Sequence, residues 1–291
     1  MINKFKTGLI NIALKFMSAD EKIFRMILET SPSNVNEIVI LPAVKVVMER
    51  IVKKLENKRK YGQVYNGKLN GIEVSVIQSL VGCPYIAEKM ECLKFTKCKK
   101  VIRVDLCGGL DLPDISMEPG KIIIPDYALC GDGTSPYYIL TYREKFKDLD
   151  FIENPIDGFK NVKAGSERIY KSYPSKELNE ILLKNAKSLY PDKILNGPFW
   201  TTDAFFCETD EIVEAWIKSG ILGVDMENSL LFLLGKLFDI KIASVTSVSD
   251  VPGHNKFDIF KSNYIHPDTF LGVDKAINIV VKSLGQIRNI P

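Results

Sequence analysis

The chain reads Gly223-Val224-Asp225-Met226-Glu227-Asn228-Ser229-Leu230 immediately before a strongly apolar segment that extends to residue 238. This stretch places two carboxylates and a thioether at the start of a predicted helix. A β-branched segment over residues 240–248 follows and ends in Ser249-Asp250. Carboxylates at the ends of neighbouring elements are where an α/β protein usually carries its chemistry. The stretch therefore indicates both an α/β fold and the place of a site.

Strands and helices alternate along the rest of the chain. Apolar runs and spacings predict strands over residues 38–41, 72–77, 100–106, 121–125 and 241–248, and helices over 44–55, 84–98, 175–189, 208–218, 227–238 and within 273–284. Asn66-Gly67 and Asn70-Gly71 are both dipeptides typical of hairpin turns. No segment has the composition of a domain linker. We expect one three-layer α/β/α domain over residues 35–291, preceded by a helical extension over residues 1–34.

Charge and hydropathy exclude several classes of protein. The net charge is +3 over 291 residues, and the lysines alternate with acids, which is typical of a solvated surface and argues against a nucleic-acid partner. Residues 1–17 carry apolar residues at helical spacing, but Asn11 and Lys15 interrupt the unbroken run that a signal peptide needs. We expect an amphipathic helix that packs on the body or on a partner subunit, with a membrane-surface role as the alternative. No segment reaches the roughly 20 apolar residues of a transmembrane helix.

The six cysteines show no paired spacing, and the chain has only two histidines, His254 and His266. A zinc site and a histidine-based catalytic triad therefore have few residues to draw on. We expect reduced, buried thiols in a cytoplasmic protein and no metal.

Several polar and aromatic positions have two interpretations when they are taken alone. Arg103 precedes Gly108-Gly109, which is typical either of a tight turn or of a backbone that approaches an anion closely. Phe205-Phe206 fits one core and one surface residue, or a platform for a flat ring. The acids of Asp225-Met226-Glu227 and of Ser249-Asp250 also have two interpretations. They could cap a helix or form a turn, or they could bind the hydroxyl groups and the ring of a ligand.

In their order along the chain, these motifs resemble those of the nucleoside phosphorylase family, which includes the purine nucleoside and uridine phosphorylases. Arg103, Cys107 and Gly108 match its strand-and-glycine motif, and the resemblance covers residues 35–284. It implies a central mixed β-sheet, cleavage of the N-glycosidic bond of a nucleoside with inorganic phosphate as co-substrate, and no other cofactor. It also implies a homo-oligomer, either a dimer or a hexamer.

The resemblance assigns a role to each matched residue. Arg103 would hold phosphate, with Lys45 as a further cation. Met226 would lie beneath the ribose, and Glu227 would bind its 2′- and 3′-hydroxyls beside Asp225. The base would be bound by Phe205, Phe206 and Ser249, and Asp250 would protonate N7 of the leaving base. This last role indicates a purine. The Gln and Arg pair of uridine phosphorylases is not found between Phe206 and Val213, so a pyrimidine substrate is the minor alternative.

The phosphate side departs from the family pattern. The early loop reads Pro42-Ala43-Val44-Lys45 in place of Pro-Gly-Asp-Pro with a following arginine. Leu106 replaces a Ser or Thr, and Asp105 replaces a glycine, which adds negative charge beside Arg103. Lys45, or the basic pair Arg59-Lys60 acting across a subunit boundary, would have to compensate.

Two alternatives to phosphorolysis follow from this departure. One is hydrolysis by water, although Val44 and Lys45 do not supply the early-loop glutamate by which the nucleosidase branch activates water. The other is a nucleoside-binding protein without catalysis.

Overall fold

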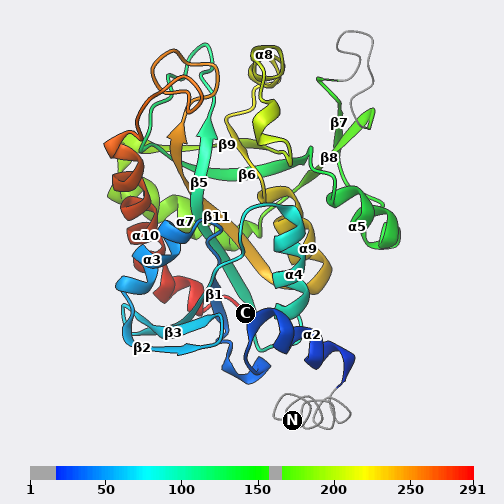
Figure 1. The fold of residues 1–291 in the computed structure, drawn as a ribbon, viewed down its shortest axis with the longest axis vertical. Coiled ribbons are helices and arrows are strands. Elements are labelled where there is room, and N and C mark those ends of the chain that lie inside the picture. The colour runs from blue at the N-terminus through cyan, green and yellow to red at the C-terminus, as the bar shows by residue number, and fades with distance from the viewer. Residues whose placement is uncertain (1–17, 157–165) are drawn as a thin grey trace, which may run out of the picture.

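The structure is a computed structural model, and it describes residues 18–156 and 166–291. Within these residues, eleven strands form one mixed β-sheet with helices on both faces, as the sequence predicts (Figure 1). The strands are β1 (Ile38–Ile40), β2 (Glu56–Tyr61), β3 (Val64–Leu69), β4 (Ile72–Ile77), β5 (Lys100–Gly109), β6 (Ile122–Cys130), β7 (Phe151–Glu153), β8 (Arg168–Ser172), β9 (Ile194–Thr201), β10 (Gly223–Asp225) and β11 (Lys241–Asp250).

Strand β5 lies at the centre of this sheet. The strand order is β2-β3-β4-β1-β5-β10-β9-β6-β8-β7, and β11 pairs with both β5 and β6. Strands β1 and β11 run parallel to β5, whereas β10 runs antiparallel to it. Consecutive side chains of β5 enter opposite layers, because Val101 packs in one hydrophobic cluster and Ile102 and Val104 in the other. A strand buried on both faces is what its β-branched sequence predicts.

Two groups of helices bury these two faces. The helices are α2 (Ala19–Leu28), α3 (Lys45–Lys53), α4 (Cys83–Leu93), α5 (Ser135–Thr141), α6 (Arg143–Phe146), α7 (Lys176–Leu189), α8 (Asp210–Lys218), α9 (Asn228–Phe238) and α10 (Pro267–Arg288), with short 3₁₀ turns at Pro32–Asn34, Pro191–Lys193 and Phe205–Cys207. Helices α3, α7 and α10 cover one face, and α2, α4 and α9 cover the other (Figure 1). Together with the sheet they make the three layers.

The glycine pair after Arg103 does not end the strand as the sequence suggested. Strand β5 continues to Gly109, which pairs with Gly223 of β10. A Cβ at Gly109 would lie 2.3 Å from Cγ of Met117, so the glycine is required by packing. The neighbouring Gly108 lies beside the ring of Pro252, where a Cβ would meet it at 3.2 Å.

Only one of the two predicted hairpin dipeptides forms a turn. Asn70 and Gly71 adopt φ of 51° and 75° between β3 and β4, as a type I′ turn requires. Asn66 instead lies within β3, where its side-chain amide donates to the Asn34 carbonyl at 2.8 Å. The strand β2 before it was not predicted, because its sequence is polar at every position and its side chains are largely exposed at the sheet edge.

The N-terminal segment joins the main core. Residues 1–17, where an amphipathic helix was expected, lie outside the described residues. Helix α2 begins after Ser18, whose hydroxyl accepts the Glu21 N–H at 3.1 Å, and it buries Phe24 and Leu28 against α4 in the same cluster as the sheet. Among residues 18–156 and 166–291, no helix has the length and apolar character needed to cross a membrane.

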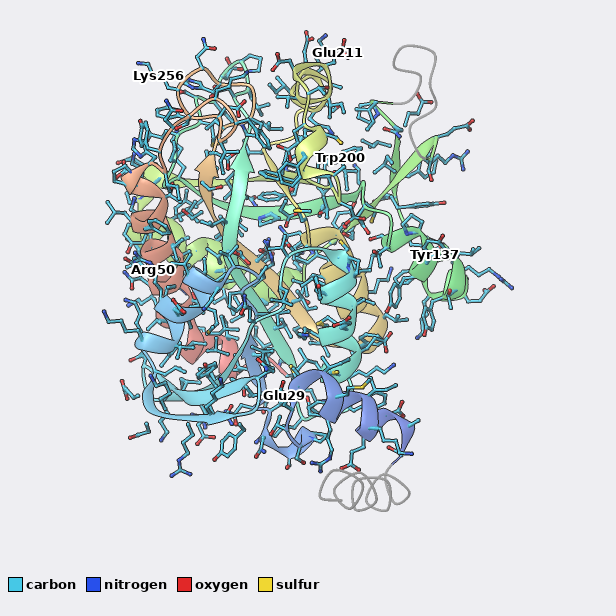
Figure 2. The ribbon with its side chains drawn as sticks, in the orientation of Figure 1. Glu29, Arg50, Tyr137, Trp200, Glu211 and Lys256 are labelled. Atoms are coloured by element: carbon cyan, nitrogen blue, oxygen red, sulfur yellow. The ribbon has the colours of Figure 1, made fainter. Side chains whose placement is uncertain are left out.

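A tryptophan pair anchors the segment that follows β9. Trp200 of β9 and Trp216 of α8 are fully buried with ring centroids 5.7 Å apart. Figure 2 shows Trp200 inside this end of the molecule, with Glu211 on α8 and Lys256 on the loop after β11 at its outer edge. The β9 strand was not predicted because Gly197-Pro198 interrupts its apolar run.

Candidate functional site

Three segments converge on the second half of β5. Parallel pairing of Ile40 with Ile102 brings the loop after β1 alongside β5. Antiparallel pairing of Val224 with Gly108 turns the chain after β10 back along β5. The end of β11 lies beside Gly108 through Asp250. The sheet register therefore gathers residues that are far apart in the sequence.

A cavity of about 290 Å³ lies where these segments meet. Its lining includes Ala43, Val44, Val81, Arg103, Asp105, Leu106, Cys107, Gly108, Phe205, Glu208, Val224, Asp225, Met226, Glu227, Ser249, Asp250 and Ile259. These residues contribute five carboxyl groups and a single cationic side chain, that of Arg103. Because most of the wall is apolar, these charges interact strongly with each other.

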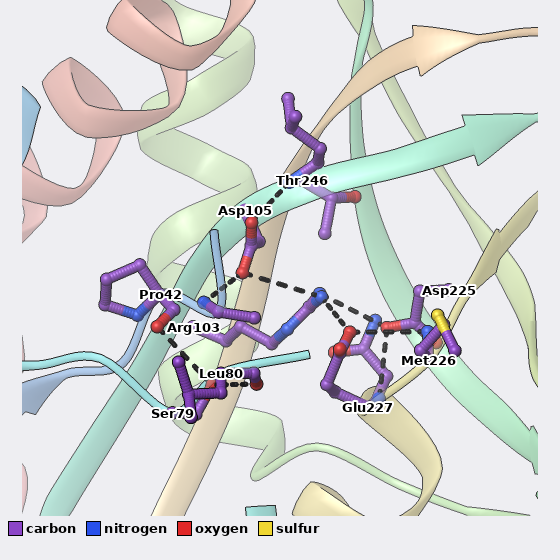
Figure 3. A network of polar contacts seen from close by, with 12 residues as sticks. Pro42, Ser79, Leu80, Arg103, Asp105, Asp225, Met226, Glu227 and Thr246 are labelled. Carbon is purple, nitrogen blue, oxygen red and sulfur yellow. Dashed lines mark hydrogen bonds and ion pairs between the residues drawn. The ribbon is translucent and has the colours of Figure 1, made fainter. Parts of the chain in front are cut away.

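Arg103 is held by three carboxyl groups (Figure 3). Its Nη2 donates to Oε2 of Glu227 and lies 3.8 Å from Oδ2 of Asp105, and its Nη1 lies 3.2 Å from Oδ2 of Asp225. All four side chains are almost completely buried. The Nε and Nη1 atoms are also covered from solvent and form no hydrogen bond. The guanidinium is therefore enclosed by the protein, with Nη2 hydrogen-bonded and Nη1 held only by its ion pair with Asp225.

The network has more negative than positive groups. Burial raises the pKa of Asp105 and Glu227, with Arg103 opposing it, and raises the pKa of Asp225 to about 6. Burial lowers the pKa of Arg103, but Glu227, Asp105 and Asp225 together hold that pKa above its usual range. The arginine thus stays charged, and the acids share its charge.

Asp105 also closes the early loop onto β5. Its Oδ2 accepts the backbone N–H of Ala43, and its Oδ1 accepts the N–H of Leu106 at 3.0 Å. The sequence indicated only that Asp105 places a negative charge beside Arg103. Its bond to Ala43 spans 62 residues and has no local pattern.

The sequence left open whether Asp225 and Glu227 cap a helix or bind a ligand. In the structure Asp225 caps a helix, whereas Glu227 lines the cavity. Asp225 accepts the Thr201 hydroxyl at 2.7 Å and the Asn228 N–H at 3.0 Å, so it caps the start of α9. Glu227 makes no capping hydrogen bond to α9; its Oε1 accepts the Gly82 N–H at 2.7 Å. The Glu227 carboxyl lines the cavity together with Met226.

Asp250 enters the cavity from an irregularity in β11. The register with β5 shifts between Val248 and Asp250, a bulge that re-aims the side chain that follows it. The Ser249 hydroxyl lies 2.5 Å from Oδ1 of Asp250 and 3.1 Å from the Cys107 carbonyl oxygen. Burial raises the pKa of Asp250 to about 6, with the hydrogen bond from Ser249 opposing it and the charge of Asp258 adding to it.

Glu208 is a cavity residue that the sequence analysis missed. It follows the 3₁₀ turn Phe205–Cys207, and the sequence indicated only that it starts a helix. Burial, with the charges of Asp250 and Asp258, raises the pKa of Glu208 to about 8. Near neutral pH the protonated form predominates, so Glu208 can donate a hydrogen bond there.

The two adjacent phenylalanines have different positions. Phe205 lines the cavity, and its ring centroid lies 5.0 Å from that of Phe260. Phe206 is 86% exposed and does not line the cavity, although its centroid lies 5.2 Å from that of Phe205. The structure therefore brings Phe205 to the site and leaves Phe206 at its rim.

The structure does not bring the other expected cations to the site. The Lys45 side chain is 75% exposed and lies 3.8 Å from Glu49 one turn along α3. Arg59 and Lys60 lie exposed on β2 and do not line the cavity of their own chain. Lys45 does not line the cavity of its own chain, because its side chain points to solvent from α3, and its phosphate contact stays a prediction.

The cysteines form no disulfide in the described chain. Five of them are buried and Cys207 is exposed. No group of three or more His, Cys, Asp or Glu side chains in the described ranges is arranged to hold a metal ion.

Two curated relatives of this chain are phosphorylases that act on purine nucleosides. Guanosine phosphorylase of Halorubrum lacusprofundi is 23% identical over 230 residues, which cover 77% of this chain and 83% of that protein. A DeoD-type purine nucleoside phosphorylase of Clostridium novyi is 28% identical over 187 residues, which cover 64% of this chain and 67% of that protein.

Solved structures agree in fold. Uridine phosphorylase from Vibrio fischeri superposes with a TM-score of 0.67 at 23% identity, over 88% of this chain and 95% of that chain. Purine nucleoside phosphorylase from Toxoplasma gondii, in complex with immucillin-H, gives a TM-score of 0.67 at 17% identity, over 90% and 95%. A family model described as the phosphorylase superfamily matches residues 37–266. The chain therefore belongs to the phosphorylase superfamily, within the group of purine nucleoside and uridine phosphorylases.

Proposed function

We propose that the protein cleaves the N-glycosidic bond of a purine nucleoside, with Asp250 as the acid that protonates the leaving base. The supporting observation is that a buried carboxyl group with a pKa of about 6 shares one cavity with Glu227 and Phe205. An acid that retains part of its proton near neutral pH suits general acid catalysis. The two sequence relatives named above are phosphorylases of guanosine and of purine nucleosides, which supports a purine over a pyrimidine.

Phe205, Glu208, Ser249 and Asp250 form what we call the base end of the cavity. In the proposed complex, the ring of Phe205 stacks on the base. The Ser249 hydroxyl holds the Asp250 carboxyl toward the base, and protonated Glu208 donates a hydrogen bond beside it. Phe206 contributes through its contact with Phe205.

The sugar would lie between this end and Arg103. Oε2 of Glu227 already accepts from Arg103 and Met226, whereas Oε1 accepts only the Gly82 N–H and retains a lone pair for one of the 2′- and 3′-hydroxyls. Met226 would pack beneath the ribose. The ribose contact expected for Asp225 stays a prediction, and its contacts favour an indirect role in holding Arg103 and the start of α9.

Ala43, Arg103, Asp105 and Leu106 form the acceptor end, where the group that attacks the sugar would lie. Phosphorolysis, with phosphate near Arg103, is the reaction that the relatives' names support. Hydrolysis is the second candidate, because a phosphate dianion would meet three carboxyl groups around one guanidinium. Each unpaired unit charge at about 4 Å would cost roughly 4 kcal/mol at an effective dielectric constant of 20.

The first test is chromatographic measurement of free base released from inosine, guanosine, adenosine and uridine. We expect release from at least one purine nucleoside and little from uridine. The Asp250→Asn variant should lower kcat by about 10²–10⁴-fold, as the loss of a general acid does, while the nucleoside still binds. Unchanged turnover in that variant would remove the assignment of the acid, and preferential release of uracil would remove the purine assignment.

We also propose that the protein works as a homo-oligomer, as the resemblance implies. Arg59 and Lys60 on the exposed edge strand β2 are then available to a neighbouring chain. Light scattering after gel filtration tests this directly, and a monomer that is active at assay concentration would contradict it.

A further inference from the structure

The acceptor end contains an anion supplied by the chain itself. Two backbone N–H groups from different segments, those of Ala43 and Leu106, donate to the two oxygens of Asp105, and the Arg103 guanidinium lies beside them. Convergent N–H donors and a guanidinium are the usual elements of an oxyanion-binding site. In this protein, a carboxylate that is only 1% exposed occupies the position that such a site would give to a ligand.

The position of Asp105 in the sequence supports the view that its carboxylate occupies an anion-binding site. The early loop and the residues after Arg103 are the segments in which the resemblance implies a phosphate site. Asp105 takes the place of a glycine there, and its side chain consumes the donors of both segments. Arg103 is also committed to Glu227 and Asp225, and its Nε and Nη1 atoms are covered from solvent. No cation among the residues lining the cavity is left to attract a second anion.

Asp105 and Asp250 face the cavity from neighbouring parallel strands. Asp250 pairs with Gly108, three positions beyond Asp105 along β5, and both carboxyl groups line the cavity. Three residues of strand place the two backbone positions about 10 Å apart along the sheet. Enzymes that hydrolyse glycosidic bonds with an acid on one side and a water-activating base on the other keep their carboxyl groups well separated, so that water and sugar fit between them.

We propose that Asp105 fills the acceptor end as a resident anion and accepts the proton of an attacking water, so that the bond is hydrolysed without phosphate. This inference rests on the proposed function. The water oxygen bonds to C1′ while the C1′–N bond breaks. The electron pair of the C1′–N bond goes to the base. The water proton passes to Asp105 and the Asp250 proton to the base, so the products are free base and free sugar. Both carboxyl groups then return to their starting states by proton exchange with solvent.

The decisive experiment uses the unmodified protein and the purine nucleoside that it cleaves best. The reaction is run in ¹⁸O-labelled water, with and without inorganic phosphate, and the sugar product is identified by mass spectrometry. We expect equal rates of base release in both conditions, and free sugar that carries one solvent oxygen. Phosphate-dependent release with a sugar 1-phosphate product would overturn the inference and leave glycosidic cleavage intact. Absence of both nucleoside binding and cleavage would overturn the proposed function itself.

A variant pair tests the residue. Asp105→Asn keeps the size of the side chain and removes the base, so we expect kcat to fall by about 10²-fold or more with KM little changed. Asp126→Asn is the matched control, because Asp126 lies exposed on β6 outside the cavity. Equal turnover in the two variants would overturn the role of Asp105.

Phosphate alone tests the resident anion without relying on any variant. Inorganic phosphate should leave the melting temperature of the unmodified protein unchanged, because a ligand stabilises only a fold that binds it. A phosphate-dependent rise at unchanged ionic strength would show that the acceptor end is open.

Discussion

The base end and the acceptor end of the cavity both bury carboxyl groups, but the surroundings of these groups differ. At the base end, Asp250 and Glu208 have no cation beside them, and burial raises the pKa of both. At the acceptor end, Asp105 shares Arg103 with two further acids. Burial raises the pKa of the carboxyl groups at both ends, but only at the acceptor end does a guanidinium oppose this rise and favour the anion. The base end is thus the better place for a proton donor, and Arg103 makes the acceptor end the better place for an anion.

The largest expected effect comes from removing the cation of the acceptor end. Arg103→Met leaves Asp105, Asp225 and Glu227 buried without their partner, which should lower the free energy of unfolding by about 3–5 kcal/mol. The loss should shrink at acid pH, where protonated acids no longer need the cation. Urea unfolding at two pH values measures both effects.

Lys45→Met is the control for that experiment. Lys45 is exposed and paired only with Glu49, so its loss should change the free energy of unfolding by less than about 1 kcal/mol. Similar losses in the two variants would show that the buried network does not depend on Arg103.

The comparison between these two cations also shows how far the sequence could lead. Arg103 sits within a β-branched strand, so its place in the sheet could be predicted from local pattern, whereas its inclusion in the site was predicted from the resemblance. Lys45 was a candidate only by its position in the early loop, and whether its side chain points inward depends on how α3 packs. The hydrogen bond from the Ala43 N–H to Asp105 depends on the pairing of β1 with β5, which no local pattern encodes.

The fold shows the same division. Helix α9 and strand β11 were predictable because their apolar runs are long, and the three-layer architecture followed from the alternation of such runs. Strand β10 has three residues and exists through its pairing with β5 and β9, so it could not be predicted. Glu208 lines the cavity directly after the 3₁₀ turn Phe205–Cys207, and no local pattern in the sequence indicates that turn.

The next largest effect concerns the pH dependence of turnover at the base end. A general acid must hold its proton, so kcat should fall about tenfold per pH unit above the pKa of Asp250, which is about 6. The groups that act on this pKa are Ser249, which lowers it, and Asp258, which raises it; Glu208 lies nearby and is largely protonated in this range. Asp258→Asn should therefore move the fall in kcat to lower pH. A profile that stays level as the pH rises through 6 would contradict the role of Asp250.

A smaller effect separates the two phenylalanines. Stacking of a base on an aromatic ring contributes about 1–3 kcal/mol by alanine substitution, so Phe205→Ala should raise KM roughly tenfold or more. Phe206→Ala should change KM much less, because Phe206 is 86% exposed and outside the cavity lining. Steady-state kinetics on one purine nucleoside compare the two variants. A larger effect at Phe206 would place the base outside the cavity described above.

The smallest effect tests whether Glu208 is as isolated from cations as its position indicates. Its pKa is about 8 in the folded protein against an ordinary 4.5, so the folded state binds this proton more tightly than the unfolded chain. The resulting stabilisation is present below pH 4.5 and is lost as the pH rises through 8. Glu208→Gln cannot ionise, so its melting temperature should rise relative to that of the unmodified protein as the pH increases, by about 2 °C because the side chain is only partly buried. Glu214→Gln, on the exposed face of α8, should show no such trend. A constant difference between Glu208→Gln and the unmodified protein at every pH would mean that Glu208 ionises freely, and the base end would then contain one proton donor, Asp250.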